Sequence, residues 1–158
     1  MFQRVLVPLD GSKVGEAALP VIRQLADKCA PDVKIDVTLI GVITLLRHWV
    51  VVGEASAPVS YTEEELNIIK NRVSDYLDKT AEVIKGNNVN VKTIVVSGNA
   101  AEEILKASER VKADLIAMST HGRSGLRRLA FGSITDKVLR GSKIPVLMVR
   151  APEGTTNE

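Results

Sequence analysis

The segment RVLVPLDGS at residues 4–12 joins an apolar run to a carboxylate and two small residues. Arg4 to Leu9 has the length and apolar content of a buried strand. The residues that follow, Ser12 to Cys29, place apolar side chains at helical spacing and predict a helix. Because Pro20 lies inside this pattern, we expect either a bend or an irregular first turn. A strand that leads at once into a helix is the repeating unit of a parallel sheet.

The same alternation of strand and helix continues along the chain. Four further apolar runs have strand length, at residues 33–42, 89–96, 114–119 and 144–149. Each later helical pattern begins with a capping signal: Thr62 with Glu65, Asn99 with Glu102, and Ser133 with Asp136. Strands that are apolar throughout predict a parallel sheet covered by helices on both faces. In such a doubly wound α/β domain, the ligand binds beyond the carboxyl ends of the strands.

Length and composition exclude several classes of protein. The 158 residues suffice for a single domain, and the 45% hydrophobic content rules out disorder for most of it. The net charge of +2 and the 3% aromatic content argue against nucleic-acid binding. The single cysteine, Cys29, excludes intrachain disulfides and cysteine-rich zinc sites, and we interpret it as a small core residue. No apolar run reaches the roughly 18 residues of a membrane span. With no leader pattern at the start, we expect a cytoplasmic protein without membrane contact.

Two segments stand outside the alternation. Residues 44–61 form a connection longer than usual, which fits a lid, a partner surface or a mobile insertion. Residues 151–158 are polar and predict a frayed tail, so we expect the domain to cover residues 1–150.

Polar and small residues gather where two predicted strands end. Asp10 follows the first strand, where it either caps the helix or accepts a hydrogen bond from a ligand base or ribose. Gly132 and Ser133 open a helix after the fourth strand, where glycines either make turns or let a backbone approach phosphate. From Thr120 to Arg150 there are seven basic residues and one acidic residue, Asp136, which favours a polyanionic ligand.

The spacing of these glycines resembles a family motif. Gly122, nine further residues and Gly132-Ser133 match the nucleotide motif of the universal stress protein family, which is Gly, two residues, Gly, nine residues, Gly, then Ser or Thr. Ser119 stands where that motif has its first glycine. Residues 120–126 and 7–12 are also similar to nucleotide-binding members, and the resemblance covers about residues 4–150.

The resemblance implies a five-stranded sheet of order 3-2-1-4-5, of the adenine-nucleotide alpha hydrolase-like type, that binds ATP, or AMP or ADP, with or without Mg²⁺. It also implies a homodimer formed through the strand Ile144 to Arg150. The matching positions imply three groups of site residues. The adenine and ribose would be surrounded by Pro8, Leu9, Asp10 and Val42, and the phosphates would be bound by Gly132, Ser133 and Ile134. The middle of the site would be lined by Met118, Ser119, His121 and Gly122, with Arg123 and Gly125 of the same loop. The hydroxyl of Ser133 either caps its helix or contacts phosphate or Mg²⁺, and Asp136 is expected to point away.

Catalytic signals are weak. The chain has no Gly-x-x-x-x-Gly-Lys-Ser/Thr loop and no Gly-x-Ser-x-Gly elbow. His121 is more typical of a residue that orders a loop than of a general base. We therefore expect no catalytic residue and, at most, slow ATP hydrolysis. The leading hypothesis is an ATP-binding regulatory or stress-response homodimer, with a further protein partner left open. One alternative is a slow ATPase of the same fold. The other is a dimeric scaffold with an empty site, which is favoured by Ser119 at the position of the first motif glycine.

Overall fold

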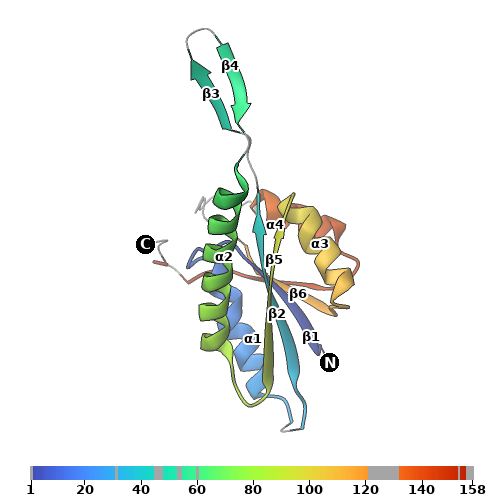
Figure 1. The fold of residues 1–158 in the computed structure, drawn as a ribbon. Coiled ribbons are helices and arrows are strands. Elements are labelled where there is room, and N and C mark those ends of the chain that lie inside the picture. The colour runs from blue at the N-terminus through green and yellow to red at the C-terminus, as the bar shows by residue number, and fades with distance from the viewer. Residues whose placement is uncertain are drawn as a thin grey trace.

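The computed structural model describes residues 2–30, 32–44, 48–52, 55–59, 61–120, 132–152 and 154–155. Its centre is a five-stranded sheet with the order β5-β2-β1-β6-β7, in which every pair of neighbours is parallel (Figure 1). The strands are β1 (Arg4–Leu9), β2 (Ile35–Ile43), β5 (Val89–Ser97), β6 (Leu115–Ser119) and β7 (Val146–Val149). When only the strands of this sheet are numbered along the chain, the order is 3-2-1-4-5. Both the predicted fold class and the predicted strand order are therefore confirmed.

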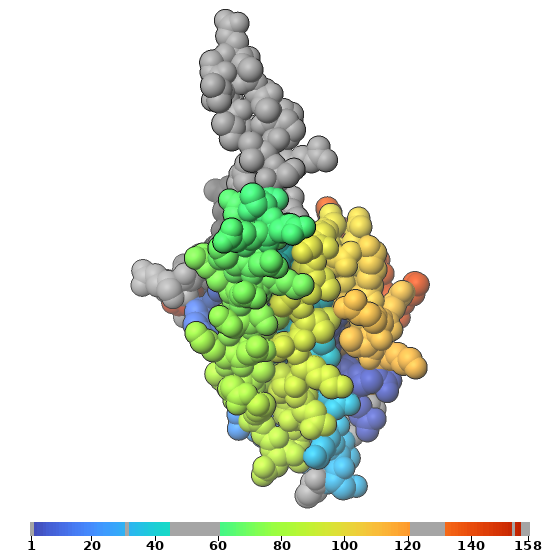
Figure 2. Space-filling model, in the orientation of Figure 1, coloured from blue at the N-terminus to red at the C-terminus, as the bar shows by residue number. Residues whose placement is uncertain are grey.

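Helices cover both faces of this sheet. They are the 3₁₀ turn η1 (Gly15–Ala17), α1 (Ala18–Asp27), α2 (Glu63–Ile84), α3 (Ala100–Arg110) and α4 (Ser133–Gly141). Side chains alternate along β1, so Val5 and Val7 pack under α1 and α2 while Leu6 packs under α3 and α4. Figure 1 shows the two helix pairs on opposite sides of the sheet, and in Figure 2 the edge strand β5 lies between α2 and α3. Each fully buried aliphatic side chain contributes about 1.5–3 kcal/mol to this packing.

Two of the three predicted helix caps are confirmed. Thr62 and Glu65 form a reciprocal capping box, with Glu65 N donating to Thr62 Oγ1 at 3.2 Å and Thr62 N to Glu65 Oε2 at 2.8 Å. Asn99 Oδ1 accepts from Glu102 N at 3.3 Å. The third helix begins at Ser133 as predicted, but its predicted cap is wrong by one residue, because Gly132 is the N-cap of α4 and Ser133 is its first helical residue. The Gly132 carbonyl already accepts from Asp136 N at 2.9 Å, which places the cap at the glycine.

The first helix is shorter than the predicted range of residues 12–29. The chain turns after Asp10, forms η1 and becomes α-helical only at Ala18. Pro20 is the third residue of α1, where its missing N–H removes no bond, because the first N–H groups of a helix have no partner within it. The expected irregular first turn is therefore present as η1. Cys29 lies beyond the end of α1, partly buried against the core.

The long connection contains a second, separate sheet. Strands β3 (His48–Val52) and β4 (Ala55–Val59) pair antiparallel with each other. This hairpin follows β2 and extends past the carboxyl end of that strand (Figure 1). The three interpretations of residues 44–61 stay predictions. Among the described helices, none has the length and apolar character needed to cross a membrane.

Candidate functional site

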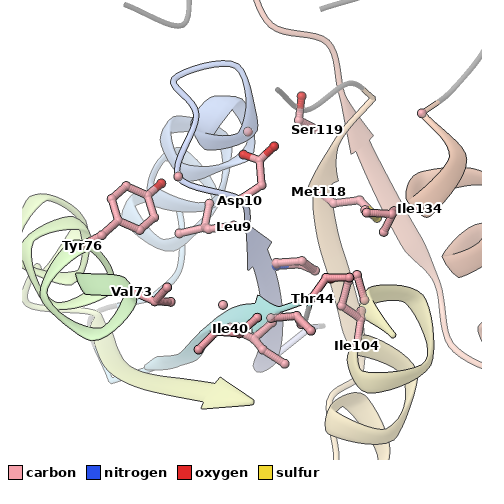
Figure 3. Close-up of a pocket in the computed structure, with 18 of the residues that line it drawn as sticks. Leu9, Asp10, Ile40, Thr44, Val73, Tyr76, Ile104, Met118, Ser119 and Ile134 are labelled. Atoms are coloured by element: carbon pink, nitrogen blue, oxygen red, sulfur yellow. The ribbon is translucent and has the colours of Figure 1, made fainter. Parts of the chain in front are cut away.

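A pocket of about 790 Å³ opens at the carboxyl ends of β1, β2 and β6, between the helices of the two faces (Figure 3). The order of the sheet explains its position, because the chain leaves β1 toward β2 on one side and β6 lies on the other. Nine of the predicted site residues line this pocket: Pro8, Leu9, Asp10, Val42, Met118, Ser119, Gly132, Ser133 and Ile134. The other four, His121, Gly122, Arg123 and Gly125, lie outside the described residues.

The carboxylate of Asp10 is fixed by its own loop. Asp10 Oδ1 accepts hydrogen bonds from Ser12 N at 3.0 Å and from Ser12 Oγ at 2.6 Å, and Ser12 Oγ accepts from Gly15 N at 2.9 Å. A Cβ at position 15 would collide with Asp10 Oδ1, so this close approach requires glycine. Gly15 is the first residue of the turn η1 (Gly15–Ala17), so its N–H is one of those that have no partner within that turn. Asp10 and Ser12 therefore shape the loop, and the Ser12 hydroxyl also satisfies the first N–H group of η1.

Ser119 is the last residue of β6 and is buried, with 5% of its surface exposed. Among the described non-glycine residues, only Lys112 has a positive φ, so Ser119 takes up no left-handed backbone where its family motif has glycine. Its carbonyl accepts from Thr135 Oγ1 at 3.3 Å, and the next carbonyl, of Thr120, accepts from Gly132 N at 3.1 Å. These two bonds hold the start of α4 against the end of β6.

The start of α4 presents backbone donors to the pocket. Ser133, Ile134 and Thr135 begin the helix, so their N–H groups cannot bond within it, and the positive end of the helix dipole lies here. Gly132 has φ −56° and ψ 148°, a conformation open to any residue. A Cβ at this position would approach Thr120 O and Thr135 Oγ1 no closer than 3.8 Å. Neither backbone strain nor crowding by described protein atoms requires glycine at position 132.

Two of the basic residues between Thr120 and Arg150 form hydrogen bonds to carboxylates. Arg140 Nε donates to Asp136 Oδ1 at 3.0 Å, and Lys143 Nζ donates to Glu109 Oε1 at 2.9 Å. These hydrogen bonds to carboxylates raise the pKa of both basic side chains. Asp136 thus bonds to its own helix and is not among the described residues that line the pocket.

The opposite wall of the pocket comes from α2 and contains residues that the sequence analysis did not assign to a site. Ile69, Arg72, Val73 and Tyr76 line it. Helical spacing correctly places the apolar ones on one face, but their position above the sheet depends on tertiary packing. The buried residues of α2 all lie at Leu77 or later, which leaves the first half of the helix to border the pocket. Among the described lining residues, only Asp10 and Arg72 are charged.

Comparison with known families decides the assignment. The model of the universal stress protein family matches residues 1–150. The chain belongs to the universal stress protein family.

One relative in this family is the universal stress protein MJ0577 of Methanocaldococcus jannaschii. It is 30% identical over 161 residues, a match that covers 95% of this chain and 96% of the relative. The solved structure of MJ0577 matches with a TM-score of 0.70 at 27% identity, covering 98% of this chain and 99% of that one. Sequence and fold therefore agree over nearly the full length of both proteins.

Two more distant universal stress protein structures contain adenine nucleotides. A protein from Arabidopsis thaliana with AMP bound matches with a TM-score of 0.64 at 12% identity, covering 99% of each chain. A universal stress protein in complex with cAMP matches with a TM-score of 0.62 at 20% identity, covering 94% of this chain and 97% of that one. At these identities the likeness establishes a shared fold.

No group of three His, Cys, Asp or Glu side chains that could hold a metal ion occurs among the described residues.

Proposed function

We propose that this universal stress protein binds an adenine nucleotide, ATP in the first place, and acts as a homodimeric regulatory or stress-response module. The observation that carries the proposal is Gly132. It borders the pocket at the start of α4, where no described protein atom requires a glycine. A bound phosphate that approaches the backbone would require one.

The two ends of the pocket suit the two ends of a nucleotide. The N–H groups of Ser133, Ile134 and Thr135 offer donors and a favourable dipole to phosphate oxygens. Asp10, with the apolar side chains of Leu9 and Ile40 nearby in the lining, offers an acceptor for a base amino group or a ribose hydroxyl. The AMP and cAMP complexes of the two distant structural neighbours support an adenine nucleotide as the ligand class.

Mg²⁺ would have few protein ligands here. Asp10 is the only carboxylate among the described lining residues, and its Oδ1 already accepts two hydrogen bonds. A magnesium ion that accompanies ATP would then be held mainly by phosphate oxygens and water, as Mg²⁺ commonly is, with the Ser133 hydroxyl as a neighbouring oxygen.

The variant Gly132→Ala tests the phosphate end. The added Cβ fits the protein and the backbone conformation. The free energy of unfolding, measured by thermal unfolding, should therefore stay unchanged or rise by the ~0.4–1 kcal/mol typical of such replacements. The same Cβ projects where phosphate would lie, so ATP affinity should fall by about tenfold or more. Isothermal titration calorimetry of both proteins with ATP and with GTP measures these affinities. We expect the wild type to bind ATP more tightly than GTP. A wild-type protein that binds no ATP at millimolar concentration would refute the proposed function.

Hydrolysis of ATP should be slow. Phosphoryl transfer needs a charge clamp and a residue that positions the attacking water. The charged groups that the described lining offers are Arg72 and a carboxylate already hydrogen-bonded to Ser12. We predict turnover well below the enzyme median of about 10 per second. Release of inorganic phosphate, followed with and without Mg²⁺, measures it, and a rate near that median would make the protein an ATPase.

A further inference from the structure

Tyr76 borders the pocket from α2, on the side away from α4. In Figure 3, Tyr76 and Ile134 lie on opposite sides of Asp10. The tyrosine hydroxyl donates to Glu16 Oε1 at 3.1 Å, a bond that joins α2 to the turn η1 across 60 residues of sequence. The other carboxylate oxygen of Glu16, Oε2, accepts from Lys13 Nζ at 2.9 Å. Only 19% of the Glu16 side chain is exposed, so this bond is partly shielded from water.

Glu16, the partner of Tyr76, belongs to the same loop that orients the carboxylate of Asp10. Glu16 N donates to the carbonyl of Ser12 at 3.3 Å, and Ser12 in turn donates twice to Asp10. Gly15, next to Glu16, donates to Ser12 Oγ and lies against Asp10 Oδ1. A chain of hydrogen bonds therefore runs from Tyr76 through Glu16 and Ser12 to the carboxylate at the end of β1.

The protonation state of Tyr76 suits a donor. Burial of the phenol, together with the neighbouring Glu16 carboxylate, raises the pKa of Tyr76 well above its ordinary value, and the charge of Asp10 adds to this rise. The hydroxyl therefore keeps its proton throughout the physiological range. A hydrogen bond from a neutral donor to a carboxylate is stronger than one between neutral groups.

We infer that Tyr76 is a positioning residue of the pocket: through Glu16 it fixes the loop of residues 10–17 against α2, and it thereby sets the affinity for the adenosine part of the ligand. The inference rests on the proposed function. Because α4 lies on the other side of Asp10, we expect the phosphate end of the pocket not to depend on this contact. Loss of the hydroxyl should weaken recognition of the nucleoside and leave recognition of phosphate unchanged.

The variant Tyr76→Phe tests this, since it removes the hydroxyl and keeps the ring. The matched control is Tyr61→Phe at the only other tyrosine, which is not among the described lining residues. Calorimetric titrations use ATP, GTP and inorganic tripolyphosphate. We expect Tyr76→Phe to weaken ATP binding about three- to tenfold and to narrow the preference for ATP over GTP. Tripolyphosphate binding should stay the same, and Tyr61→Phe should bind all three ligands like the wild type.

A double-mutant cycle with Glu16→Ala separates a specific contact from general damage. If the bond acts as inferred, Tyr76→Phe in the Glu16→Ala background causes little further loss of ATP affinity. Hydrogen exchange in the absence of nucleotide measures how firmly the loop of residues 10–17 is held. The amides of Ser12 and Gly15 should exchange faster in Tyr76→Phe than in the wild type. Equal ATP binding by wild type and Tyr76→Phe, or equal losses for ATP and tripolyphosphate, overturns the inference and leaves the proposed function intact. A wild type that binds no ATP overturns both.

Discussion

Ser119 is the position where this chain departs from the nucleotide motif of its family, and its conformation decides what the departure costs. A non-glycine residue in the left-handed region costs roughly 1–2 kcal/mol. Ser119 avoids that cost as the extended last residue of β6. Its replacement of glycine therefore leaves the backbone of the site intact.

We therefore predict that Ser119→Gly changes ATP affinity by less than about tenfold, or roughly 1.4 kcal/mol. Ser119→Leu should abolish binding, because the larger side chain would fill the pocket that Ser119 lines. Titration of the three proteins with ATP measures both effects. A Ser119→Gly variant that binds ATP when the wild type does not would mean that the chain has lost its nucleotide site.

Local sequence predicted the positions of single residues well where the relevant interactions are local. The capping box of Thr62 and Glu65 and the extended state of Ser119 depend on a few neighbouring residues. Tyr76 illustrates the opposite case. Its partner Glu16 is distant in sequence, and nothing in the spacing of either residue indicates that they meet. The α2 wall of the pocket could not be predicted for the same reason.

Among the secondary-structure elements, α2 gives the pocket its one described cationic side chain. Arg72 lines the pocket and makes no ion pair with any carboxylate in the described part of the chain. A guanidinium in this position attracts an anionic ligand, although its exposure keeps the gain small.

Arg72→Ala should therefore weaken ATP binding about two- to fivefold, corresponding to ~0.5–1 kcal/mol, with a smaller loss at high salt. The control is Lys70→Ala, which removes an exposed positive charge from the same helix outside the described lining. Titrations at two ionic strengths compare the variants. Equal losses in both would indicate a general effect of helix charge and would exclude a role for Arg72 in the pocket.

Element boundaries were predictable to the extent that apolar periodicity marks them. β1 begins and ends as expected, since buried parallel strands are apolar throughout. An irregular first turn was expected because of Pro20, but the late start of α1 was not. The bond that Ser12 donates to Asp10 and the bond that it accepts from Gly15 override a helical spacing that continues through the same residues. The β3–β4 hairpin was also not predicted, since two strands of five residues carry little pattern.

At the scale of the whole molecule, β7 forms one edge of the sheet and has four partly exposed apolar residues. The carbonyls of Pro145 and Val149 accept from Ile116 N and Thr120 N of the β6 side. Because backbone groups alternate along a strand, the N–H of Met148 points away from β6. A second copy that paired with this edge would use that N–H, and we propose a homodimer formed in this way.

Met148→Pro should convert the dimer to a monomer while the fold remains, because proline removes the outward donor and leaves the bonds to β6 in place. Met148→Leu, which keeps the N–H and nearly the same volume, should remain dimeric. Sedimentation at micromolar concentration gives the masses. Leu147 is unsuitable for this test, because its side chain packs against the core. A monomeric wild type would contradict the proposed dimer.

The pairing of β1 has a consequence for the order in which the chain acquires its structure. Val5 pairs with Val37 on one side and with Leu115 on the other, so the central strand gains its second neighbour only after most of the chain exists. Contacts this distant in sequence slow folding, because a long loop must close before the pairing can stabilise it. During synthesis on the ribosome, one edge of this central strand therefore stays open until β6 has emerged. An unpaired strand edge is prone to aggregation, so we expect the nascent protein to be vulnerable during that interval.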